Sequence, residues 1–290
     1  MSEHCLHEPV LAWYDEHARE LPWRGPDASA WAVMVSEFML QQTPVARVLP
    51  VHDRWLARWP TPSALAAETA GEAVRAWGRL GYPRRALRLH ASAVAITERH
   101  GGVVPAGYDD PRALPGVGDY TAAAVAVFAY GRRHAVLDTN VRRVLTRALD
   151  GREHPPGSVT TGERRRAEQL LPGEEAAAAT WSIGLMELGA LVCTARSPRC
   201  SDCPVADGCA WRAAGYPAYD GPVRRGQRWD GTDRQCRGRL LAVVREAAGP
   251  VHDDRLAAVW PDSTQRARCV AGLLRDGLVV RTAAASYALP

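Results

Sequence analysis

The sequence predicts an all-α fold for most of this 290-residue chain. Apolar residues recur at helical spacing from Val10 to about Ala214, and proline and glycine residues separate these stretches. No run of alternating apolar and polar residues, the pattern of a half-buried strand, interrupts this region. Near its end four cysteines lie close together, which indicates that a metal centre holds the last part of this body.

The helices expected from this pattern cover residues 31–42, 70–77, 85–99, 120–129, 139–149 and 180–192. Residues 215–232 carry several Gly, Pro and Arg residues and few aliphatic ones, so they predict a linker. A compact module should follow at residues 233–290, with helices at 234–247, 253–260 and 265–276 and a hairpin at 278–289. This order predicts a winged-helix-like module, and a small helical cap without a function of its own fits equally well.

The charge of the chain permits a polyanionic partner without requiring one. The net charge is +4, and all 36 basic residues are arginine. Arginine binds phosphate through two parallel hydrogen bonds, but codon bias in a GC-rich genome would also favour it. Without lysine, no side-chain amine can form a Schiff base. Because the sequence shows no apolar signal segment and no run long enough to span a bilayer, we expect a soluble, cytoplasmic protein without a membrane partner.

The four cysteines have the spacing C-x6-C-x2-C-x5-C, formed by Cys193, Cys200, Cys203 and Cys209. Soft thiolate ligands select zinc or an iron–sulfur cluster. A zinc ribbon normally has two tight pairs separated by a longer arm, whereas this run has one short pair flanked by wider gaps. The spacing therefore favours a [4Fe–4S] cluster. Buried or disulfide-bonded cysteines are the alternative, and nothing in the chain indicates secretion.

The segment L-P-G-V-G-D-Y-T-A at residues 114–122 predicts a turn that starts a helix. Pro115 ends the preceding segment, while Gly116 and Gly118, on either side of Val117, permit positive φ and close backbone approach. The new helix then presents free N–H groups and its positive dipole end to an anion. A helix–hairpin–helix holds a DNA phosphate in this way. Many helix pairs need a glycine turn, but this fuller pattern is more specific.

Glu37 lies among apolar residues on the helix predicted at 31–42. A carboxylate in such surroundings is expected to be partly desolvated, and desolvation raises the pKa of a carboxyl group. A raised pKa suits a general acid near neutral pH. An acid on the exposed side of an amphipathic helix would give the same local pattern.

Asp138 follows a short apolar run and precedes the helix predicted at 139–149, which is the position of an N-cap. An aspartate held at a helix N-terminus is expected to stay ionised. An ionised carboxylate can stabilise a developing sugar cation, so a capping role and a catalytic role are compatible here.

Together these motifs resemble the endonuclease III-like DNA glycosylases, and within them the MutY-type adenine DNA glycosylases. The resemblance runs from about Leu11 to Trp211, through S-E-F-M-L-Q-Q-T, G-x-L-G-Y, L-P-G-V-G-x-Y-T-A, D-T-N-V-R-R-V, M-E-L-G-A and the four cysteines, all in the family's order. It implies a two-lobed helix–hairpin–helix glycosylase fold with an iron–sulfur cluster loop. The cluster domain would comprise residues 1–26 and 136–214, and the helical domain with the hairpin would comprise residues 27–135.

One hairpin position separates the branches of this family. Relatives similar to endonuclease III have a lysine that attacks the sugar and cuts the strand, and this chain has Tyr120 in its place. The resemblance therefore implies a monofunctional glycosylase. Glu37 is similar to the glutamate of the adenine-specific branch, and a thymine glycosylase for G:T mismatches would share Tyr120. A non-catalytic iron–sulfur protein that binds DNA is a third possibility.

The resemblance also implies a role for each site residue in removing adenine opposite 8-oxoguanine or guanine from double-stranded DNA, with the protein as a monomer. After base flipping, Glu37 would protonate the adenine, and Asp138 would stabilise the oxocarbenium-like sugar. The further residues implied are Asn140 and Tyr120, which orient Asp138; Leu21, Trp23 and Arg24 in the adenine pocket; Gln42 and Tyr82 as wedges; Gln42, Thr43 and Leu80, next to Leu40 and Gln41, at the opposite base; and Arg84, Arg85, Arg88, Arg142, Arg143, Arg196 and Arg199 at phosphates. Any single arginine is more often an ordinary solvated residue.

The chain departs from the family's pattern in two places. Family members often place Gln or Glu against the base where this chain has Ile183, which cannot make that hydrogen bond. The tail, from Asp230 to Pro290, is too short for the Nudix-like domain that usually recognises 8-oxoguanine. We expect the tail to bind the flanking duplex, through Arg234, Arg237 and Arg239.

Overall fold

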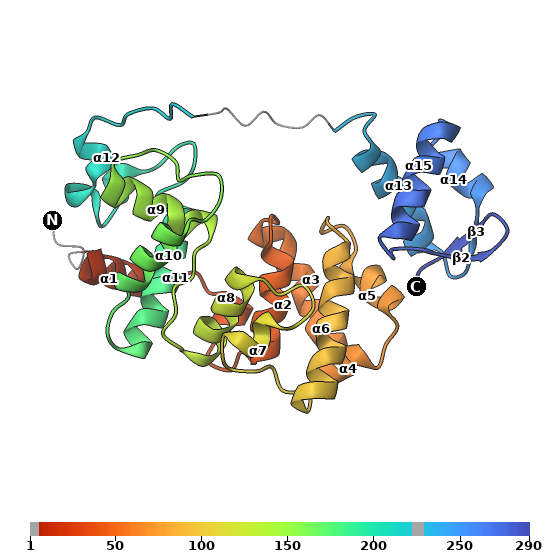
Figure 1. The fold of residues 1–290 in the computed structure, drawn as a ribbon, viewed down its shortest axis with the longest axis horizontal. Coiled ribbons are helices and arrows are strands. Elements are labelled where there is room, and N and C mark those ends of the chain that lie inside the picture. The colour runs from red at the N-terminus through yellow and green to blue at the C-terminus, as the bar shows by residue number, and fades with distance from the viewer. Residues whose placement is uncertain (1–5, 222–228) are drawn as a thin grey trace. The chain divides into compact units, whose positions relative to one another are not determined.

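The structure, a computed structural model, describes residues 6–221 and 229–290, and helices make up most of it (Figure 1). Part of the linker predicted at 215–232 therefore lies outside the described residues. No helix in the described residues combines the length and the apolar character needed to cross a membrane. The elements before the linker are α1 (His7–His17), η2 (Pro22–Arg24), α2 (Ala30–Leu40), α3 (Val45–Arg58), α4 (Pro62–Ala66), α5 (Ala70–Trp77), α6 (Arg84–His100), α7 (Asp109–Arg112), α8 (Asp119–Tyr130), α9 (Thr139–Asp150), α10 (Thr161–Gln169), α11 (Glu175–Leu191), η3 (Cys200–Asp202), η4 (Ala206–Gly208) and α12 (Ala210–Ala213).

The chain forms two compact units. The first unit contains α1 and the helices from α7 to α12, and the second contains most of α2, helices α3–α6 and the C-terminal elements. Within the described residues the chain crosses between the units at 33–34, 105–106, 113–114 and 116–117. This division differs from the expected domain boundaries, because residues 117–135 group with the cysteine loop and the C-terminal module groups with α2–α6.

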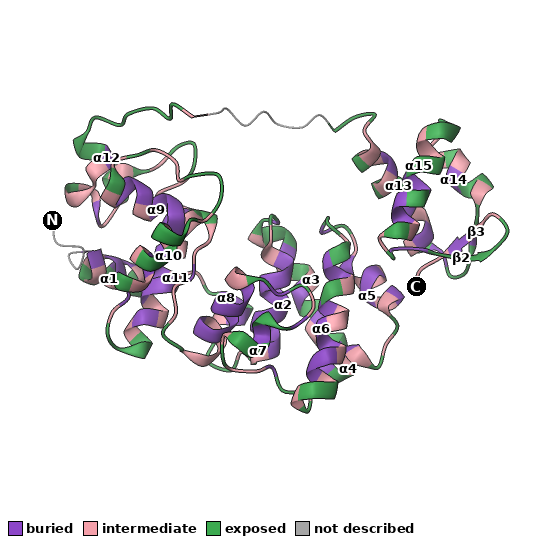
Figure 2. Ribbon diagram, in the orientation of Figure 1, coloured by how far each residue is buried: buried purple, intermediate pink, exposed green. Residues whose placement is uncertain are grey.

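The first unit is built around α11, which packs against α1, α9 and α8. Because several neighbours cover it, α11 is apolar on more than one face, and its buried residues include Trp181 and Leu185. Val10 of α1 and Val144 of α9 join the same core, seen as the buried faces of these helices in Figure 2. This core fixes the start of α9, where Asp138 stands.

The second unit has an aromatic core beneath α3 and α5. The rings of Trp55 and Trp59 meet edge to face with centroids 4.7 Å apart, and Trp77 meets Trp55 in the same way at 5.7 Å. Local signals define α5: the Thr69 hydroxyl accepts from Glu72 N–H at its start, and Gly78 (φ +58°) ends it.

The C-terminal module contains three helices and a small sheet, in the order α13 (Asp233–Glu246), β1 (Val251–His252), α14 (Asp253–Val259), α15 (Ser263–Arg275), β2 (Val280–Ala283) and β3 (Ser286–Ala288). The strands pair antiparallel in the order β1-β3-β2, with Val251 opposite Tyr287 and Val280 opposite Ala288. The expected helices and hairpin are confirmed. Strand β1 was not expected, because two residues are too few to show alternation.

This module packs onto α5. The Arg75 guanidinium donates to the carbonyls of Ala247 (3.0 Å) and Arg245, and Arg245 donates to the carbonyl of Gly78. Gly71 N–H donates to the Pro290 carbonyl at 2.8 Å, and a Cβ at Gly71 would lie only 2.4 Å from that oxygen. Glycine is therefore required where the C-terminal segment crosses α5.

Candidate functional site

Glu37 is buried in α2, in the second unit, with 4% of its surface exposed. The alternative of an exposed acid on an amphipathic helix is therefore wrong. A buried carboxyl group can exchange a proton with a bound substrate without competition from bulk water, so Glu37 has the surroundings that a general acid needs.

Asp138 caps α9 in the first unit, as predicted. Its carboxylate accepts from Val141 N–H at 2.6 Å and from Asn140 Nδ2 at 2.7 Å. Burial raises its pKa above the ordinary value of 3.8, and these hydrogen bonds and the nearby charge of Arg143 oppose that rise. The expectation that the cap alone keeps Asp138 ionised thus left out the cost of burial. Tyr120 lies half-buried in the first turn of α8, in the same unit.

A chain of contacts connects Asp138 to the cysteine loop. Arg143 donates to Asn140 Oδ1 (2.7 Å), to the Gly189 carbonyl (2.6 Å) and to the Cys193 carbonyl (2.7 Å). A Cβ on Gly189 would lie 2.7 Å from Asn140 Cβ and 2.8 Å from its carbonyl oxygen. The glycine of M-E-L-G-A therefore lets α11 approach the start of α9 closely.

The segment expected to line an adenine pocket surrounds a carboxylate that the sequence analysis did not single out. Leu21 and Trp23 are buried, with 7% and 5% of their surfaces exposed. Arg24 donates to Glu187 Oε2 at 2.9 Å, and Arg19 donates to both Glu187 oxygens. Glu187 is fully buried, and its arginine partners outweigh the burial, so its pKa is lowered. A fixed anion thus lies against the predicted base pocket.

Only tertiary contact reveals Glu187, because its partners stand more than 160 residues away in the chain. The one signal in the sequence was an acid within an otherwise apolar helix pattern in M-E-L-G-A. Ile183, the expected departure from the family pattern, is half-buried one turn earlier on α11.

Buried Arg85 joins two turns that carry the predicted wedge residues. Its guanidinium donates to carbonyls at the end of α2, including Phe38 (2.9 Å), to Thr43 Oγ1 (2.9 Å) and to the Gly81 carbonyl (3.0 Å). Thr43 Oγ1 also lies 3.3 Å from the carbonyl oxygen of buried Leu80. These bonds hold the turn after Leu40 against the turn before α6.

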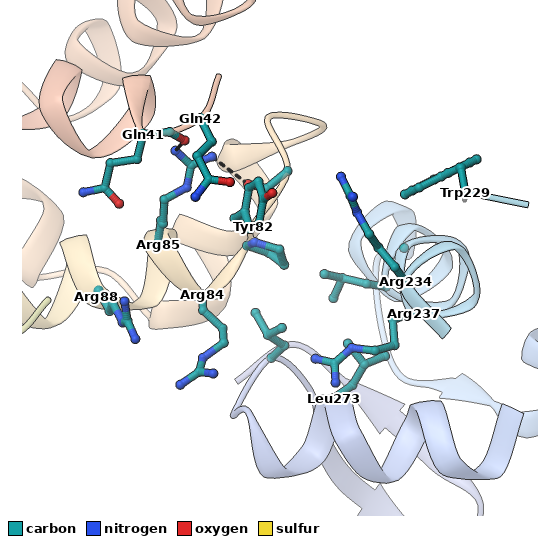
Figure 3. Close-up of a pocket in the computed structure, with 15 residues that line it drawn as sticks. Gln41, Gln42, Tyr82, Arg84, Arg85, Arg88, Trp229, Arg234, Arg237 and Leu273 are labelled. Atoms are coloured by element: carbon teal, nitrogen blue, oxygen red, sulfur yellow. Dashed lines mark hydrogen bonds between the residues drawn. The ribbon is translucent and has the colours of Figure 1, made fainter. Parts of the chain in front are cut away.

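Both wedge residues have strained backbones. Gln42 (φ +57°) and Tyr82 (φ +48°) adopt the left-handed conformation that residues with a Cβ rarely take. Each such residue costs about 1–3 kcal/mol and persists where the surroundings over-determine it, often at functional sites. Tyr82 is 48% exposed, and Gln41 and Gln42 line the same hollow beside it (Figure 3). The structure therefore presents these side chains outward on a fixed frame.

The hairpin has the predicted backbone. Gly116 has φ +77°, and a Cβ there would lie 2.6 Å from the Cβ of Arg88, so only glycine fits. Val117 is buried, and Gly118 caps α8 with an extended backbone. Since Gly118 has no side chain to fill the cap, the first N–H groups of α8 remain available to an anion.

The four cysteines line one hollow, together with Arg147 and Trp211. Within the described residues no group of three or more His, Cys, Asp or Glu side chains is arranged to hold a single metal ion. Burial raises the pKa of the Cys203 thiol to about 11, so its thiolate needs the positive charge of iron. Arg147 Nη1 lies 3.4 Å from Cys193 Sγ, which suits a thiolate ligand.

Some of the arginines expected at phosphates are buried and hydrogen-bonded within the protein, and others are exposed. Arg142 is buried and donates to Glu163 at 2.8 and 3.1 Å as well as to two carbonyls, so its donors are already engaged within the protein and its contact with DNA stays a prediction. Arg85 and Arg143 are likewise buried and hydrogen-bonded within the protein. Arg196 and Arg199 are exposed on the cysteine loop, and Arg199 donates to the Leu191 carbonyl at 3.0 Å.

Comparison with known proteins places the chain among base excision repair proteins. The family described as HhH-GPD superfamily base excision DNA repair protein matches residues 35–166, and the iron–sulfur binding domain of endonuclease III matches residues 193–209. The adenine DNA glycosylase of Mycobacterium tuberculosis (strain CDC 1551 / Oshkosh) is 53% identical over 99% of this chain and 94% of its own length. The adenine DNA glycosylase of Mycolicibacterium smegmatis is 54% identical over 97% of this chain and 94% of its own length. The predicted [4Fe–4S] cofactor is thereby confirmed.

Solved structures agree on the fold. A thermostable thymine-DNA glycosylase superposes with a TM-score of 0.65 over 73% of this chain and 97% of its own, at 24% sequence identity. This likeness confirms the predicted helix–hairpin–helix glycosylase fold.

Proposed function

This chain belongs to the adenine DNA glycosylase family, and we propose that it flips out and hydrolyses adenine paired with 8-oxoguanine or guanine in double-stranded DNA. The observation that carries this proposal is the two carboxyl groups in the family motifs, buried Glu37 in α2 and half-buried Asp138 at the start of α9. The two can take opposite roles, because one must hold a proton and the other must carry a charge.

In the proposed reaction Glu37 protonates the flipped adenine, so that the base leaves as a neutral group. Asp138, positioned by Asn140 and with Tyr120 from the same unit, stabilises the positive charge that develops on the sugar, and water completes the hydrolysis. No lysine exists in the chain to attack the sugar, so the enzyme leaves an intact strand with an abasic site.

Leu21, Trp23 and Arg24 are proposed to surround the flipped adenine. Glu187 is fully buried and its oxygens accept from Arg19 and Arg24, so it would position the Arg24 guanidinium beside the base without contacting the base itself.

The [4Fe–4S] cluster supplies a structural centre, and we propose Cys193, Cys200, Cys203 and Cys209 as its ligands. The loop that these cysteines shape would present Arg196 and Arg199 to the DNA backbone, and the hairpin N–H groups at Gly116, Val117 and Gly118 would bind another phosphate. The protein is expected to act as a monomer.

The test is base release from duplexes that carry A:8-oxoguanine, A:G or T:G pairs, with abasic sites detected with and without alkali. Strand cleavage at adenine only after alkali is the expected result. The variant Glu37→Gln keeps the size of the side chain and removes its titrating proton, so it should bind the A:8-oxoguanine duplex and release no adenine. Release of thymine from the T:G duplex by the wild-type protein would instead assign it to mismatch thymine repair.

A further inference from the structure

Helix α10 is held in the first unit by polar contacts more than by apolar ones. In its span of Thr161–Gln169, all of which the structure describes, only Ala167 is buried, and most of the other residues are charged or polar. A short helix with so little apolar surface gains little from burial, so its position depends on what its polar side chains contact. Those contacts lead to the two segments that carry Tyr120 and Asp138.

Arg164 connects α10 to the start of α8. Its guanidinium pairs with the Asp119 carboxylate, and Arg164 Nη2 lies 2.9 Å from Asp119 Oδ2. Asp119 is the first residue of α8 and Tyr120 is the second. The other oxygen of Asp119 accepts from Arg112 Nε of α7 at 2.5 Å. One carboxylate therefore ties the first turn of α8 to two other helices, α7 and α10.

Glu168, one turn further along α10, connects this helix to the segment that ends at Asp138. Glu168 Oε1 accepts from Ala135 N–H at 2.9 Å and lies 3.3 Å from His134 Nδ1. Residues four apart lie on the same face of a helix, so Arg164 and Glu168 can contact the two segments at once. Helix α10 therefore joins the start of α8 to the segment that ends at Asp138.

The two segments also meet without α10. The Tyr108 ring stacks on His134 with centroids 4.4 Å apart, and burial and the nearby Asp119 carboxylate raise the pKa of the Tyr108 hydroxyl. Tyr120 packs against a small buried cluster of alanine and valine side chains that includes Val136 of the second segment. Small side chains make few contacts each, so this cluster alone fixes the two segments less firmly than larger side chains would. The contacts from α10 add the constraint that the cluster lacks.

We propose that Arg164 and Glu168 are positioning residues for the reaction, and that they fix the separation of Tyr120 and Asp138 by bracing the two segments from α10. The proposal rests on the proposed function, in which Asp138 acts together with Tyr120. Both bracing side chains are partly exposed, and ion pairs of such side chains contribute little to the stability of a fold. A displacement of about 1 Å near the reacting atoms can nevertheless lower a rate about 100-fold. The two contacts should therefore affect the rate of adenine release far more than the Tm.

Two alanine variants break one contact each. Arg164→Ala removes the ion pair at the start of α8, and Glu168→Ala removes the acceptor of Ala135 N–H. Glu168→Gln is the rescue variant, because its amide oxygen can still accept from this N–H group. The matched controls are Arg165→Ala and Gln169→Ala, which remove exposed side chains at the neighbouring positions of α10.

The measurements are the single-turnover rate of adenine release at saturating enzyme, the Kd for the A:8-oxoguanine duplex and the Tm. We expect Arg164→Ala and Glu168→Ala to lower the rate about tenfold, with the Kd within about twofold and the Tm within about 2 °C of the wild type. Glu168→Gln should restore the rate to within about twofold, and the two controls should leave it unchanged.

Hydrogen exchange of the backbone tests the brace without any activity. Ala135 N–H should exchange at least about tenfold faster in Glu168→Ala than in the wild type, and at the wild-type rate in Glu168→Gln. Wild-type exchange in Glu168→Ala, or a wild-type release rate in both alanine variants, would overturn the proposal. So would a rate that falls only together with a rise in Kd, which marks a contact with DNA, or a loss of rate that Glu168→Gln shares. The proposed function fails separately: wild-type protein that releases no adenine from any duplex would refute it, while hydrogen exchange would still decide whether α10 holds this segment.

Discussion

Replacing Arg85 by methionine should destabilise the second unit and weaken lesion binding together. Arg85→Met keeps the length and apolar stem of the side chain and removes every donor. The guanidinium is 5% exposed and donates to four carbonyls and to Thr43 Oγ1. No other described contact fixes the turn of Gln42 against the turn of Tyr82 to this extent. Both residues hold a left-handed backbone that should relax once these bonds are lost.

The expected loss of stability in Arg85→Met is the contribution of the lost hydrogen bonds minus the cost of burying the charge of Arg85. Each hydrogen bond from a charged donor contributes roughly 1.5 kcal/mol at the lower end. Burial lowers the pKa of Arg85 from 12.5 to about 10, which at about 1.4 kcal/mol for each pH unit corresponds to a cost of roughly 3 kcal/mol. With the five bonds of Arg85, the net loss in Arg85→Met is about 4 kcal/mol, or a fall of roughly 10 °C in Tm for a unit of this size.

Thermal unfolding and the Kd for an A:8-oxoguanine duplex measure the two effects. Arg99→Met is the control, because Arg99 is exposed near the end of the same helix and its loss should change Tm by only about 1 °C. A folded Arg85→Met protein with the Tm and lesion affinity of the wild type would show that the turns hold their conformation without this side chain, and the reasoning would fail.

Three further outcomes are expected. Gly189→Ala should displace Asn140 and lower the rate of adenine release at least about tenfold at saturating DNA, since even a methyl group would lie 2.7 Å from Asn140 Cβ; a rate equal to the wild type would contradict this. Cys203→Ser should lower the iron content per purified chain and the Tm, whereas full iron content would exclude Cys203 as a ligand. Burial raises the pKa of Asp138, so the folded state binds the proton of this carboxyl group more tightly than the unfolded state does. Above that pKa the charged form of Asp138 therefore lowers the free energy of unfolding. Asp138→Asn removes this charge and should lose at least about 100-fold in rate, and the wild-type rate should begin to fall, as the pH is lowered, at a higher pH than for an ordinary aspartate; a variant rate equal to that of the wild type would refute this account.

Features that depend on a few neighbouring residues could be predicted from the sequence. Residues 70–77 form a helix with the predicted ends, because Thr69 caps it and Gly78 ends it. Asp138 occupies the predicted cap for the same local reason. The hairpin at residues 114–118 is equally local, since only glycine permits its backbone at Gly116.

Features that depend on distant contacts could not be predicted. The sequence shows Arg85 and Arg88 as equivalent members of one basic cluster, yet three residues along α6 change which way the side chain points. Arg85 therefore points inward to carbonyl groups and Arg88 outward to solvent. The sequence does not show that Glu187 lies at the site, because this depends on its ion pairs with Arg19 and Arg24 in the folded chain.

The contacts of the buried arginines give a physical reason for arginine, and not lysine, at these positions. Arg143 donates to the carbonyls of Gly189 and Cys193, and Arg147 donates to those of Glu153, Thr194 and Ala195. Five donors in a planar fork can bind several carbonyl groups at once, whereas an ammonium group is a compact point charge. Codon bias can explain why exposed positions carry arginine, but it does not explain these multiple contacts. At the buried positions a change to lysine would leave carbonyl groups without donors, so there the residue type is fixed by the fold itself.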